Sequence, residues 1–355
     1  MTPLPESTAG PKTTIVITSI SAPNQALRDY ALGCARHGAK LLVMGDQESP
    51  SDFSLDECDY YDVRRQLETG FRAAAVAPLG HYARKNIGYL LAMGAGAPYI
   101  VETDDDNIPL PGFWSSRRKR HTVRCSVNRG WVNVYRYFSS GAIWPRGFPL
   151  SELRTPVIPF DELPLREIEC PIQQALADGD PDVDSIHRLV FPGRTHFAAN
   201  RSVAIAPGSW CPFNSQNTTW WPECYPLMYL PGCCSMRLTD IRRSFVAQRI
   251  VSANGWGIRF ESPTVEQHRN AHDLMRDFED EVPGYLSNAS IVAALERVDI
   301  RPGAGRIVEN LWSCYEELAR SGLIAADEMR LLDAWLADYA AVASSYHNFK
   351  GGTQT

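Results

Sequence analysis

The stretch "YIVETDDDNIP", residues 99–109, places three adjacent aspartates directly after an apolar run that is typical of a buried strand. Neighbouring carboxylates repel one another, so a positive partner is expected to hold them. An EF-hand loop does not fit, because Ile108 and Pro109 occupy positions that need an oxygen ligand and a glycine. Three interpretations remain: a solvated acidic loop, the nucleophile site of an aspartyl phosphatase, and a metal site.

The first hundred residues alternate between strand-like and helix-like segments. Strands are predicted at 13–20, 40–46 and 98–106, and helices at 24–37 and 82–96. This order predicts an α/β fold with a right-handed, mostly parallel sheet. Ligands bind beyond the carboxyl ends of such strands, and Ser19, Asp46 and Asp104 all fall at that edge. We therefore expect Ser19 and Asp46 to form hydrogen bonds with a nucleoside.

The position of the aspartates at this edge favours the metal site over the other two interpretations. A phosphatase nucleophile normally follows the first strand, whereas this cluster follows the third predicted strand. Mg²⁺ and Mn²⁺ are hard cations that bind one or two carboxylates together with substrate phosphates. The sequence therefore predicts that the aspartates bind a divalent metal and a diphosphate.

Composition excludes several other classes of protein. The chain has 355 residues, 44% of them hydrophobic and 21% charged, and a net charge of -6, which gives no basic footprint for nucleic acid. No apolar run reaches the roughly 18 residues of a membrane span. Nine scattered cysteines without a CxxC pair, and no export signal, predict reduced thiols in a cytoplasmic protein. The basic run at residues 117–120 is predicted to be a solvated loop.

Six blocks of sequence carry a resemblance to a known family. They are "TSISAPN" (18–24), "HYARKNIGYL" (81–90), "TDDDN" (103–107), "PFNSQNTTWW" (212–221), "MRLTDIRRSFVAQR" (236–249) and "VEQHRNAHDLMRDFEDEVPGY" (265–285). Together they resemble the STELLO glycosyltransferase-like family, over roughly residues 13 to 285. More distantly, they are similar to the reversibly glycosylated polypeptides, which include UDP-arabinopyranose mutases.

The resemblance implies a GT-A fold, a Rossmann-type sheet in which an Asp-x-Asp motif holds Mn²⁺ or Mg²⁺ against the diphosphate of a nucleotide sugar. Asp106 is then the main metal ligand, and Asp104 binds the ribose or, through water, the metal. Asp105 either joins the donor site or points away from it. GT-A enzymes often add a late histidine ligand, and His272 matches the family block better than His268 does.

The same resemblance gives roles to basic residues and to one further carboxylate. Arg84 and Lys85 begin a helix that contacts the base or phosphate in GT-A enzymes; an exposed basic patch is the alternative. Asp240 lies at a predicted helix start, beside the acceptor hydroxyl. It would be the general base if transfer inverts the sugar, and would position the acceptor or stabilise the cation if transfer retains configuration. A simple helix cap is the competing interpretation.

The second half of the sequence differs in character from the first. Residues 140 to 235 are rich in proline, glycine and aromatics, which predicts an acceptor subsite built from loops. Trp220 and Trp221 are expected to stack on an acceptor sugar, although one of two adjacent residues in a strand is usually buried. Arg237, Arg243 and Arg249 are candidates for binding phosphate or an acidic acceptor, with Arg237 assigned to the acceptor.

These observations predict a disordered N-terminus (1–12), a GT-A domain (13–285) with a nucleotide half (13–110) and an acceptor half (111–285), and a helical extension (286–350). Apolar stripes on the extension are expected to pack on the domain or to form a homodimer. The predicted activity is metal-dependent hexosyl or pentosyl transfer from a UDP-sugar to a glycan or glycolipid. A nucleotide-sugar mutase and a non-catalytic binding scaffold are the alternatives.

Overall fold

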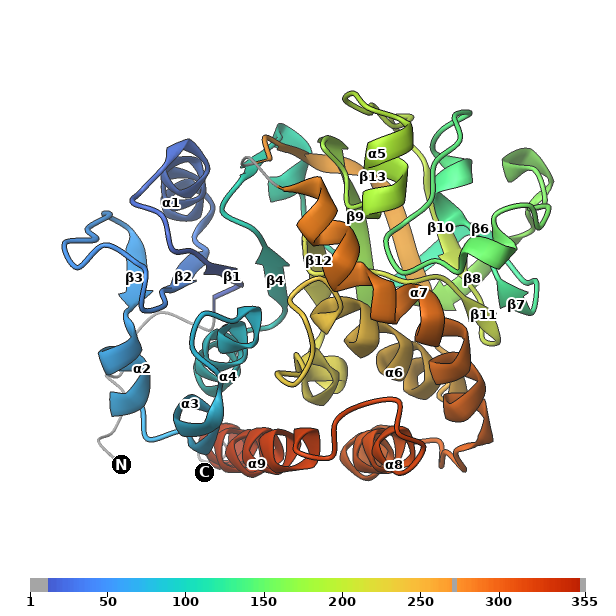
Figure 1. Cartoon of the computed structure of the whole chain (residues 1–355). Helices are drawn as coiled ribbons and strands as arrows, with labels where there is room; N and C mark the ends of the chain where they lie inside the picture. The colour runs from blue at the N-terminus through green and yellow to red at the C-terminus, as the bar shows by residue number, and fades with distance from the viewer. Residues whose placement is uncertain (1–11, 270–272, 352–355) are drawn as a thin grey trace.

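A mixed β-sheet forms the centre of the fold, and the strand that leads to the three aspartates lies inside it (Figure 1). The computed structural model describes residues 12–269 and 273–351. The strands of the first half are β1 (Thr14–Thr18), β2 (Lys40–Met44), β3 (Cys58–Tyr61) and β4 (Ile100–Thr103). They are mutually parallel in the order β3-β2-β1-β4, so their carboxyl ends meet at one edge.

The second half of the chain continues the same sheet. Its strands are β5 (Asn107–Pro109), β6 (Arg120–Ser126), β7 (Gly130–Trp131), β8 (Leu165–Glu169), β9 (Ile172–Gly179), β10 (Ser202–Ile205), β11 (Ser209–Trp210), β12 (Asn217–Trp220) and β13 (Ile258–Gln267). The order after β4 is β12-β9-β13-β10-β6-β8, while β5 pairs with β13, and β7 and β11 form a separate pair. β12 is antiparallel to both of its neighbours, so the whole sheet is mixed.

Helices cover the sheet and extend from its C-terminal part. They are α1 (Gln25–His37), α2 (Val63–Glu68), α3 (Arg72–Val76), α4 (Lys85–Gly94), α5 (Ser185–Val190), α6 (Thr239–Ala253), α7 (Leu274–Arg297), α8 (Ile307–Arg320) and α9 (Glu328–Gly351). Short 3₁₀ helices are η1 (Tyr82–Arg84), η2 (Pro111–Trp114), η3 (Val134–Tyr137), η4 (Leu150–Glu152), η5 (Phe160–Glu162), η6 (Pro222–Met228) and η7 (Ala304–Arg306). The predicted α/β class with added C-terminal helices is confirmed.

Local sequence explains the first helix and its packing partner. Asn24 caps α1 by accepting a hydrogen bond from the Leu27 backbone N–H at 3.0 Å, and Gly38 ends the helix in the left-handed region at φ 65°. α4 approaches the sheet closely, because a Cβ at Gly88 would lie only 2.6 Å from the Val16 side chain. α1 therefore spans nearly the predicted helix 24–37, whereas α4 is shorter than the predicted helix 82–96, since Tyr82–Arg84 form the 3₁₀ helix η1.

The loop-built second half predicted from residues 140–235 is wrong. β8, β9, β10 and β12 all lie in this segment and pair into the main sheet. β12 reads "NTTW" and β9 reads "IQQALADG", so polar side chains such as Gln173 and Thr219 interrupt the apolar pattern that identifies a strand. These polar residues are buried, and the sheet satisfies their backbone groups from both sides.

The C-terminal helices pack on the domain that precedes them. The stripe Ile307, Leu311, Tyr315 and Leu318 of α8 is buried, and so are Leu331, Leu332 and Trp335 of α9. Figure 1 shows α8 and α9 lying together below α4 and α6. Asp338 of α9 accepts hydrogen bonds from the backbone N–H groups of Arg72 and Ala73, at 3.0 and 2.7 Å. The chain itself therefore covers the stripes through which a homodimer contact was also expected.

α7 starts at Leu274 and runs across residue 286, the boundary that the sequence predicts for the helical extension. Among the helices of the described residues, none combines the length and the apolar character that a bilayer crossing requires. The disorder expected for residues 1–12 and for the last residues falls almost wholly on positions 1–11 and 352–355, which lie outside the described residues.

A buried ion pair joins the strand before the aspartates to the helix that carries Asp240. Arg243 of α6 donates to both carboxylate oxygens of Glu102 on β4, at 2.7 and 2.8 Å. Tyr89 of α4 and Trp220 of β12 donate to the same carboxylate, Trp220 at 2.7 Å. Since Glu102 and Arg243 are almost completely shielded from water, one charge without the other would be left buried and uncompensated.

We predict that Arg243→Met lowers the free energy of unfolding by about 3–5 kcal/mol, because it leaves the Glu102 charge buried without its cation. Urea denaturation checks this. The double variant Glu102→Gln/Arg243→Met should lose less than the single variant, since no charge then remains. The control Arg64→Met, at a side chain that is 80% exposed, should change stability by no more than about 0.5 kcal/mol. A single variant as stable as this control would contradict the role of the pair.

Candidate functional site

The three aspartates after β4 face three different sets of partners. Asp104 accepts hydrogen bonds from the Tyr82 hydroxyl at 2.6 Å and from the Lys85 ammonium at 3.2 Å. Asp105 accepts from the Ser19 hydroxyl at 2.5 Å. Asp106 accepts from the Gln267 side-chain amide at 2.9 Å. The cluster is thus held by β1, η1, the start of α4 and the end of β13.

Positive charge around the cluster is scarce. In the described part of the chain, the ion pair between Lys85 and Asp104 is the one ion pair that reaches the three aspartates. Burial, followed by the neighbouring charge of Asp104, raises the pKa of Asp106 to about 7. Burial also raises the pKa of Asp105. Lys85 is thus the cation that pairs with the cluster, and Arg269 lowers the pKa of Asp106 without forming an ion pair with it, so negative charge still exceeds positive charge when all three aspartates are ionised.

One oxygen of Asp106 has no partner in the described residues. Its Oδ2 accepts from Gln267, whereas Oδ1 is buried and receives no hydrogen bond. A buried acceptor without a donor is costly, and a cation can satisfy it as well as a donor can. The same cation would also supply the charge that the three aspartates lack. The donor set, made of hard carboxylate oxygens, suits Mg²⁺ or Mn²⁺.

The protein side chains do not complete a metal shell by themselves. Within residues 12–269 and 273–351, no three His, Cys, Asp or Glu side chains are grouped so that they could hold a metal ion. The predicted ligand His272 lies outside the described residues. His268, the second histidine of that block, has a largely exposed side chain, and its Nε2 lies 3.4 Å from Glu266.

The other residues predicted at the sheet edge lie around the aspartates. Ser19 donates to Asp105, as described above. Asp46, after β2, accepts from the backbone N–H of His81 at 3.2 Å, just before Tyr82. Lys85 is buried and also donates to the Thr103 carbonyl at 2.6 Å. The structure therefore brings Ser19, Asp46 and Lys85 to the same edge as the aspartates.

A chain of hydrogen bonds connects Asp104 to Asp240. Ser215 lies between them, with its hydroxyl 2.9 Å from the Tyr82 hydroxyl and 3.1 Å from Asp240 Oδ2. Tyr82 in turn donates to Asp104. The two carboxylates that the sequence assigned to donor and acceptor chemistry thus belong to one connected site.

Several hydrogen bonds fix the carboxylate of Asp240 at its end of this hydrogen-bond chain. Its Oδ2 accepts from the Ser215 backbone N–H at 3.1 Å and from Arg146 at 2.9 Å, and Oδ1 accepts from the Ile241 N–H at 3.0 Å. Arg146 also binds Asp182 through two bonds of 2.7 and 2.8 Å. The helix-cap interpretation is wrong, because the cap position of α6 is Leu238 and makes no side-chain hydrogen bond.

Arg84 and three other arginines that were predicted to bind ligands form hydrogen bonds with other parts of the protein. Arg84 is buried and donates to Gln66 and to the Ala77 carbonyl, at 2.8 and 3.2 Å, so a donor contact from its side chain is not supported. Arg237 donates to Glu281 through two bonds of 2.8 and 2.6 Å. Arg243 binds Glu102, and Arg249 donates to backbone carbonyls at the end of α7. These guanidinium groups hold the fold together instead of binding phosphate or an acceptor.

The predicted aromatic platform is also wrong. Trp220 is fully buried and Trp221 is 8% exposed. β12, which carries Trp220, is paired on both edges, and the Trp220 indole donates to Glu102 within the core. A ring in this position cannot offer its face to a sugar.

Sequence analysis did not single out Tyr82, Arg146, Ser215 and Gln267. Three of them lie inside resembling blocks, Tyr82 in "HYARKNIGYL", Ser215 in "PFNSQNTTWW" and Gln267 in "VEQHRNAHDLMRDFEDEVPGY". Membership of these blocks was the feature of the sequence that could have pointed to Tyr82, Ser215 and Gln267. Arg146 lies in no such block, and only the three-dimensional contact with Asp240 reveals its place in the site.

Comparison with known proteins relates the chain to one family of plant proteins. The family model of STELLO glycosyltransferases matches residues 237–353, so the match begins beside Asp240 and runs beyond residue 285 through the C-terminal helices. "Probable glycosyltransferase STELLO1" of Arabidopsis thaliana is 25% identical over 371 residues, covering 92% of this chain and 44% of that protein. "Probable glycosyltransferase STELLO2" of the same plant is 26% identical over 355 residues, with the same coverage.

The chain therefore spans less than half the length of these curated relatives. Among solved structures, "Crystal Structure of a Mycobacterial Protein" is similar with a TM-score of 0.38 and 11% identity, covering 79% of this chain and 75% of that one.

We predict that Asp106 destabilises the metal-free protein at neutral pH. Its raised pKa means that the folded state binds the proton more tightly than the unfolded chain does, so this contribution to stability is lost as pH rises from about 4 to about 7. Asp106→Asn cannot ionise, and in EDTA at pH 8 it should melt about 2 °C or more above the wild type. The difference should shrink at pH 5.

Thermal melts at the two pH values measure this difference. The control Asp161→Asn, at a side chain that is 88% exposed, should melt like the wild type at both. If Asp106→Asn melts below the wild type at pH 8, the fold stabilises the charge of Asp106 and the site is not short of positive charge.

Proposed function

With the resemblance to STELLO-type glycosyltransferases confirmed along most of the chain, we propose that this protein transfers a sugar from a nucleotide-sugar donor to a hydroxyl acceptor. The observation that carries the proposal is the aspartate cluster at the carboxyl edge of the parallel strands. There one buried oxygen of Asp106 has no partner among residues 12–269 and 273–351, and hydrogen bonds link Asp104 to Asp240. We take the donor to be a UDP-sugar, with a hexose or pentose as the sugar and a glycan or glycolipid as acceptor.

The site fits a divalent cation, Mn²⁺ or Mg²⁺. Asp106 would hold it through the unpartnered Oδ1, and Asp104 would contact it through water or bind the ribose. His272 is the candidate for a further ligand. Cations of this kind bind one or two carboxylates and leave the remaining positions to substrate phosphates. When bound, the cation would neutralise the charge that develops on the departing diphosphate.

The residues around the cluster supply the donor-binding surface. Ser19, Asp46 and Asp105 present hydroxyl and carboxylate oxygens at the ends of β1, β2 and β4, where a nucleoside would lie. Lys85 contributes through Asp104: its buried ammonium holds both Asp104 and the Tyr82 hydroxyl, the latter at 2.6 Å. The fold thereby fixes the orientation of Asp104 before any ligand binds, which reduces the entropy lost on binding.

Asp240 fits a role in positioning the acceptor or stabilising a cation better than the role of general base. Its oxygens already accept from Arg146, from Ser215 and from the Ile241 N–H, and its side chain is 6% exposed. A carboxylate in this state is a fixed negative charge, suited to stabilising positive charge or to orienting the Ser215 hydroxyl. We therefore assign Asp240 a positioning role in a reaction with an oxocarbenium-like transition state.

A nucleotide-sugar mutase is the second candidate function, and one observation favours it. Trp220, Trp221 and Arg237, which were expected to bind an acceptor, are buried or engaged in the core. A mutase needs the donor site but no acceptor platform. Incubating the protein with Mn²⁺ and UDP-arabinopyranose, without acceptor, separates the two: a mutase produces the furanose form, and a transferase leaves the ring form unchanged.

We predict that metal and nucleotide bind together. In isothermal titration calorimetry, Mn²⁺ should lower the Kd for UDP, and UDP should lower the Kd for Mn²⁺ by the same factor, because the phosphate oxygens complete the metal shell. Asp106→Asn should abolish this coupling, and the exposed control Asp161→Asn should retain it. UDP binding that is equally tight in EDTA would remove the metal from the proposal, and absence of UDP binding would remove the donor.

We predict that Asp240→Asn separates binding from turnover. The amide keeps the size of the side chain but removes its charge, so the sugar-transfer rate should fall by about 10²-fold or more. The Kd for Mn²⁺–UDP should stay within about twofold, because the aspartates after β4 hold that ligand. A near wild-type transfer rate in a folded variant would show that Asp240 has no part in the chemistry. Normal binding without transfer by the wild type, across UDP- and GDP-sugars, would support the non-catalytic scaffold instead.

A further inference from the structure

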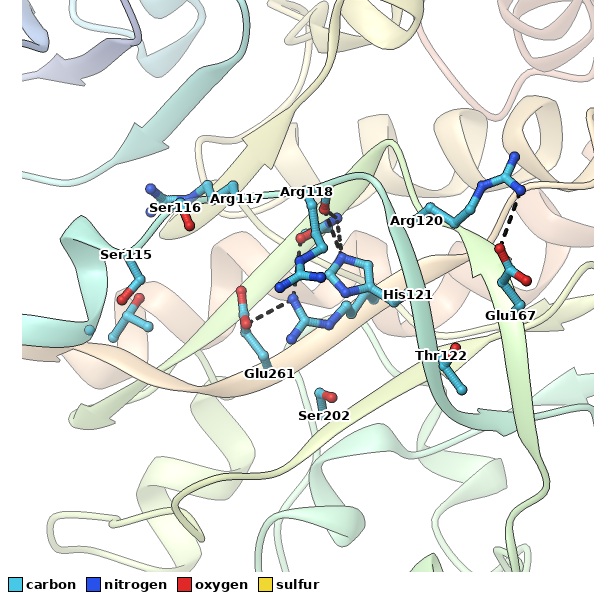
Figure 2. Close-up of a pocket in the computed structure, with 14 residues that line it drawn as sticks. Ser115, Ser116, Arg117, Arg118, Arg120, His121, Thr122, Glu167, Ser202 and Glu261 are labelled. Atoms are coloured by element: carbon cyan, nitrogen blue, oxygen red, sulfur yellow. Dashed lines mark hydrogen bonds and ion pairs between the residues drawn. The ribbon is translucent and has the colours of Figure 1, made fainter.

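A second polar cavity lies away from the aspartate cluster, on the part of the sheet made by β6, β9, β10 and β13. It has a volume of about 690 Å³ and is lined by residues 115–118 of the loop after η2 and by side chains of these strands (Figure 2). We call it the arginine cavity, because Arg117, Arg118, Arg120 and Arg259 all line it. The first three belong to the basic run that sequence analysis treated as a solvated loop.

The cavity is on the sheet face opposite α6. Side chains alternate between the two faces of a strand, and Ile258 and Phe260 of β13 belong to the core that α6 also joins. Arg259 and Glu261 therefore point to the other face, where they line the cavity. None of the cavity-lining residues is among those placed in the donor site, so the two sites are separate.

Charge in the cavity is unbalanced toward positive. Four arginines face two carboxylates, Glu167 and Glu261. Arg120 pairs with Glu167 at 3.3 Å, and Arg259 pairs with Glu261 at 2.9 Å. Figure 2 marks both pairs with dashed lines.

Arg117 and Arg118 remain without a carboxylate partner. Within the described residues neither forms an ion pair, and Arg117 instead lies over the rings of Phe113 and Tyr99, at 5.1 and 5.9 Å. Burial lowers the pKa of the Arg117 guanidinium, and the nearby Tyr99 and Glu261 offset this effect only in part. Arg117 and Arg118 therefore add two positive charges to the cavity that form no ion pair within the described residues.

Unused hydrogen-bond donors accompany these charges. The Nε of Arg259 is buried and has no partner in the described residues. The hydroxyls of Ser115, Ser116 and Thr122 also line the cavity. Planar guanidinium groups match the oxygens of phosphate and carboxylate in pairs, and hydroxyls add single donors. The cavity lining thus offers guanidinium and hydroxyl donors together, although the Arg118 and Arg120 side chains remain open to water.

We propose that the arginine cavity binds a ligand that carries two or more phosphate or carboxylate groups. This site is distinct from the nucleotide-sugar site, and the inference stands whether or not sugar transfer is the activity. Thr264 lines the cavity, and three residues later on the same strand Gln267 binds Asp106. β13 thus connects the arginine cavity to the aspartate cluster.

The first test uses inorganic pyrophosphate as the probe, titrated by calorimetry in EDTA so that no metal-dependent site contributes. The wild type should bind pyrophosphate, and binding should weaken as salt is raised. Arg117→Gln/Arg118→Gln should raise the Kd about 10-fold or more, since hydrogen bonds to charged groups are lost. Arg118→Gln alone, at an exposed side chain, should weaken binding in the same direction and serves as the variant least able to disturb folding.

Two controls make the result specific. Arg154→Gln removes an exposed arginine outside the cavity and should bind pyrophosphate like the wild type. Asp106→Asn should also bind normally, which separates this site from the proposed donor site. The proposal is overturned if the wild type does not bind pyrophosphate, or if Arg118→Gln and the double variant, both folded by circular dichroism, bind as tightly as the wild type.

A second arm identifies the source of the anion. The protein is sedimented with vesicles of phosphatidylcholine, with or without phosphatidylinositol bisphosphate. Sedimentation that needs the phosphorylated lipid and is lost in Arg117→Gln/Arg118→Gln would identify a lipid headgroup as the ligand. Binding of free pyrophosphate without sedimentation would identify a soluble anion. Binding in neither arm would contradict the proposal.

Discussion

The buried ion pair between Glu102 and Arg243 fixes the position of the whole candidate site. Glu102 lies two residues before Asp104 on β4, and Arg243 lies three residues after Asp240 on α6. Pairing the two side chains therefore places the metal-binding candidates and Asp240 at a set separation. Tyr89 and Trp220 donate to the same carboxylate, so α4 and β12 are held in the same arrangement. The site is built over one charge pair that water does not reach.

The candidate site combines fixed hydrogen bonds with an excess of negative charge. Lys85, Tyr82 and Ser215 form a fixed chain from Asp104 to Asp240, whereas Asp106 carries a buried oxygen that receives no hydrogen bond from the described residues. Such a combination costs stability in the free protein, and a bound cation would compensate this cost. In the arginine cavity the excess charge is positive, so there a bound anion would compensate it. Both features are regions where the fold holds charge in excess of what it neutralises.

Sequence alone predicted the parts that depend on local pattern. The strand and helix order of the first hundred residues, the start of α6 and the buried stripe of α8 all follow from spacing. The edge location of Ser19, Asp46 and Asp104 followed as well, because parallel strands align their carboxyl ends. The structure agrees on each of these points.

Sequence could not predict the parts that depend on pairing between distant residues. β9 and β12 carry polar side chains that hide their strand pattern, so their insertion into the sheet becomes visible only when their partners are known. That insertion buries Trp220 and removes it from any acceptor surface. Likewise Arg84, Arg237 and Arg243 read as phosphate ligands in isolation, and their partners Gln66, Glu281 and Glu102 lie from 18 to 141 residues away. A charge is assigned to function or to structure only once its partner is known.

The central claim is that a divalent cation binds at Asp106 together with a nucleoside diphosphate. Crystals grown with Mn²⁺ and UDP, measured near the manganese absorption edge, test it most directly. The account predicts an anomalous peak within about 2.0–2.3 Å of an Asp106 carboxylate oxygen, with the diphosphate on its open side. A complex in which UDP binds with no manganese peak at Asp106, or in which manganese and UDP occupy separate places, would contradict it.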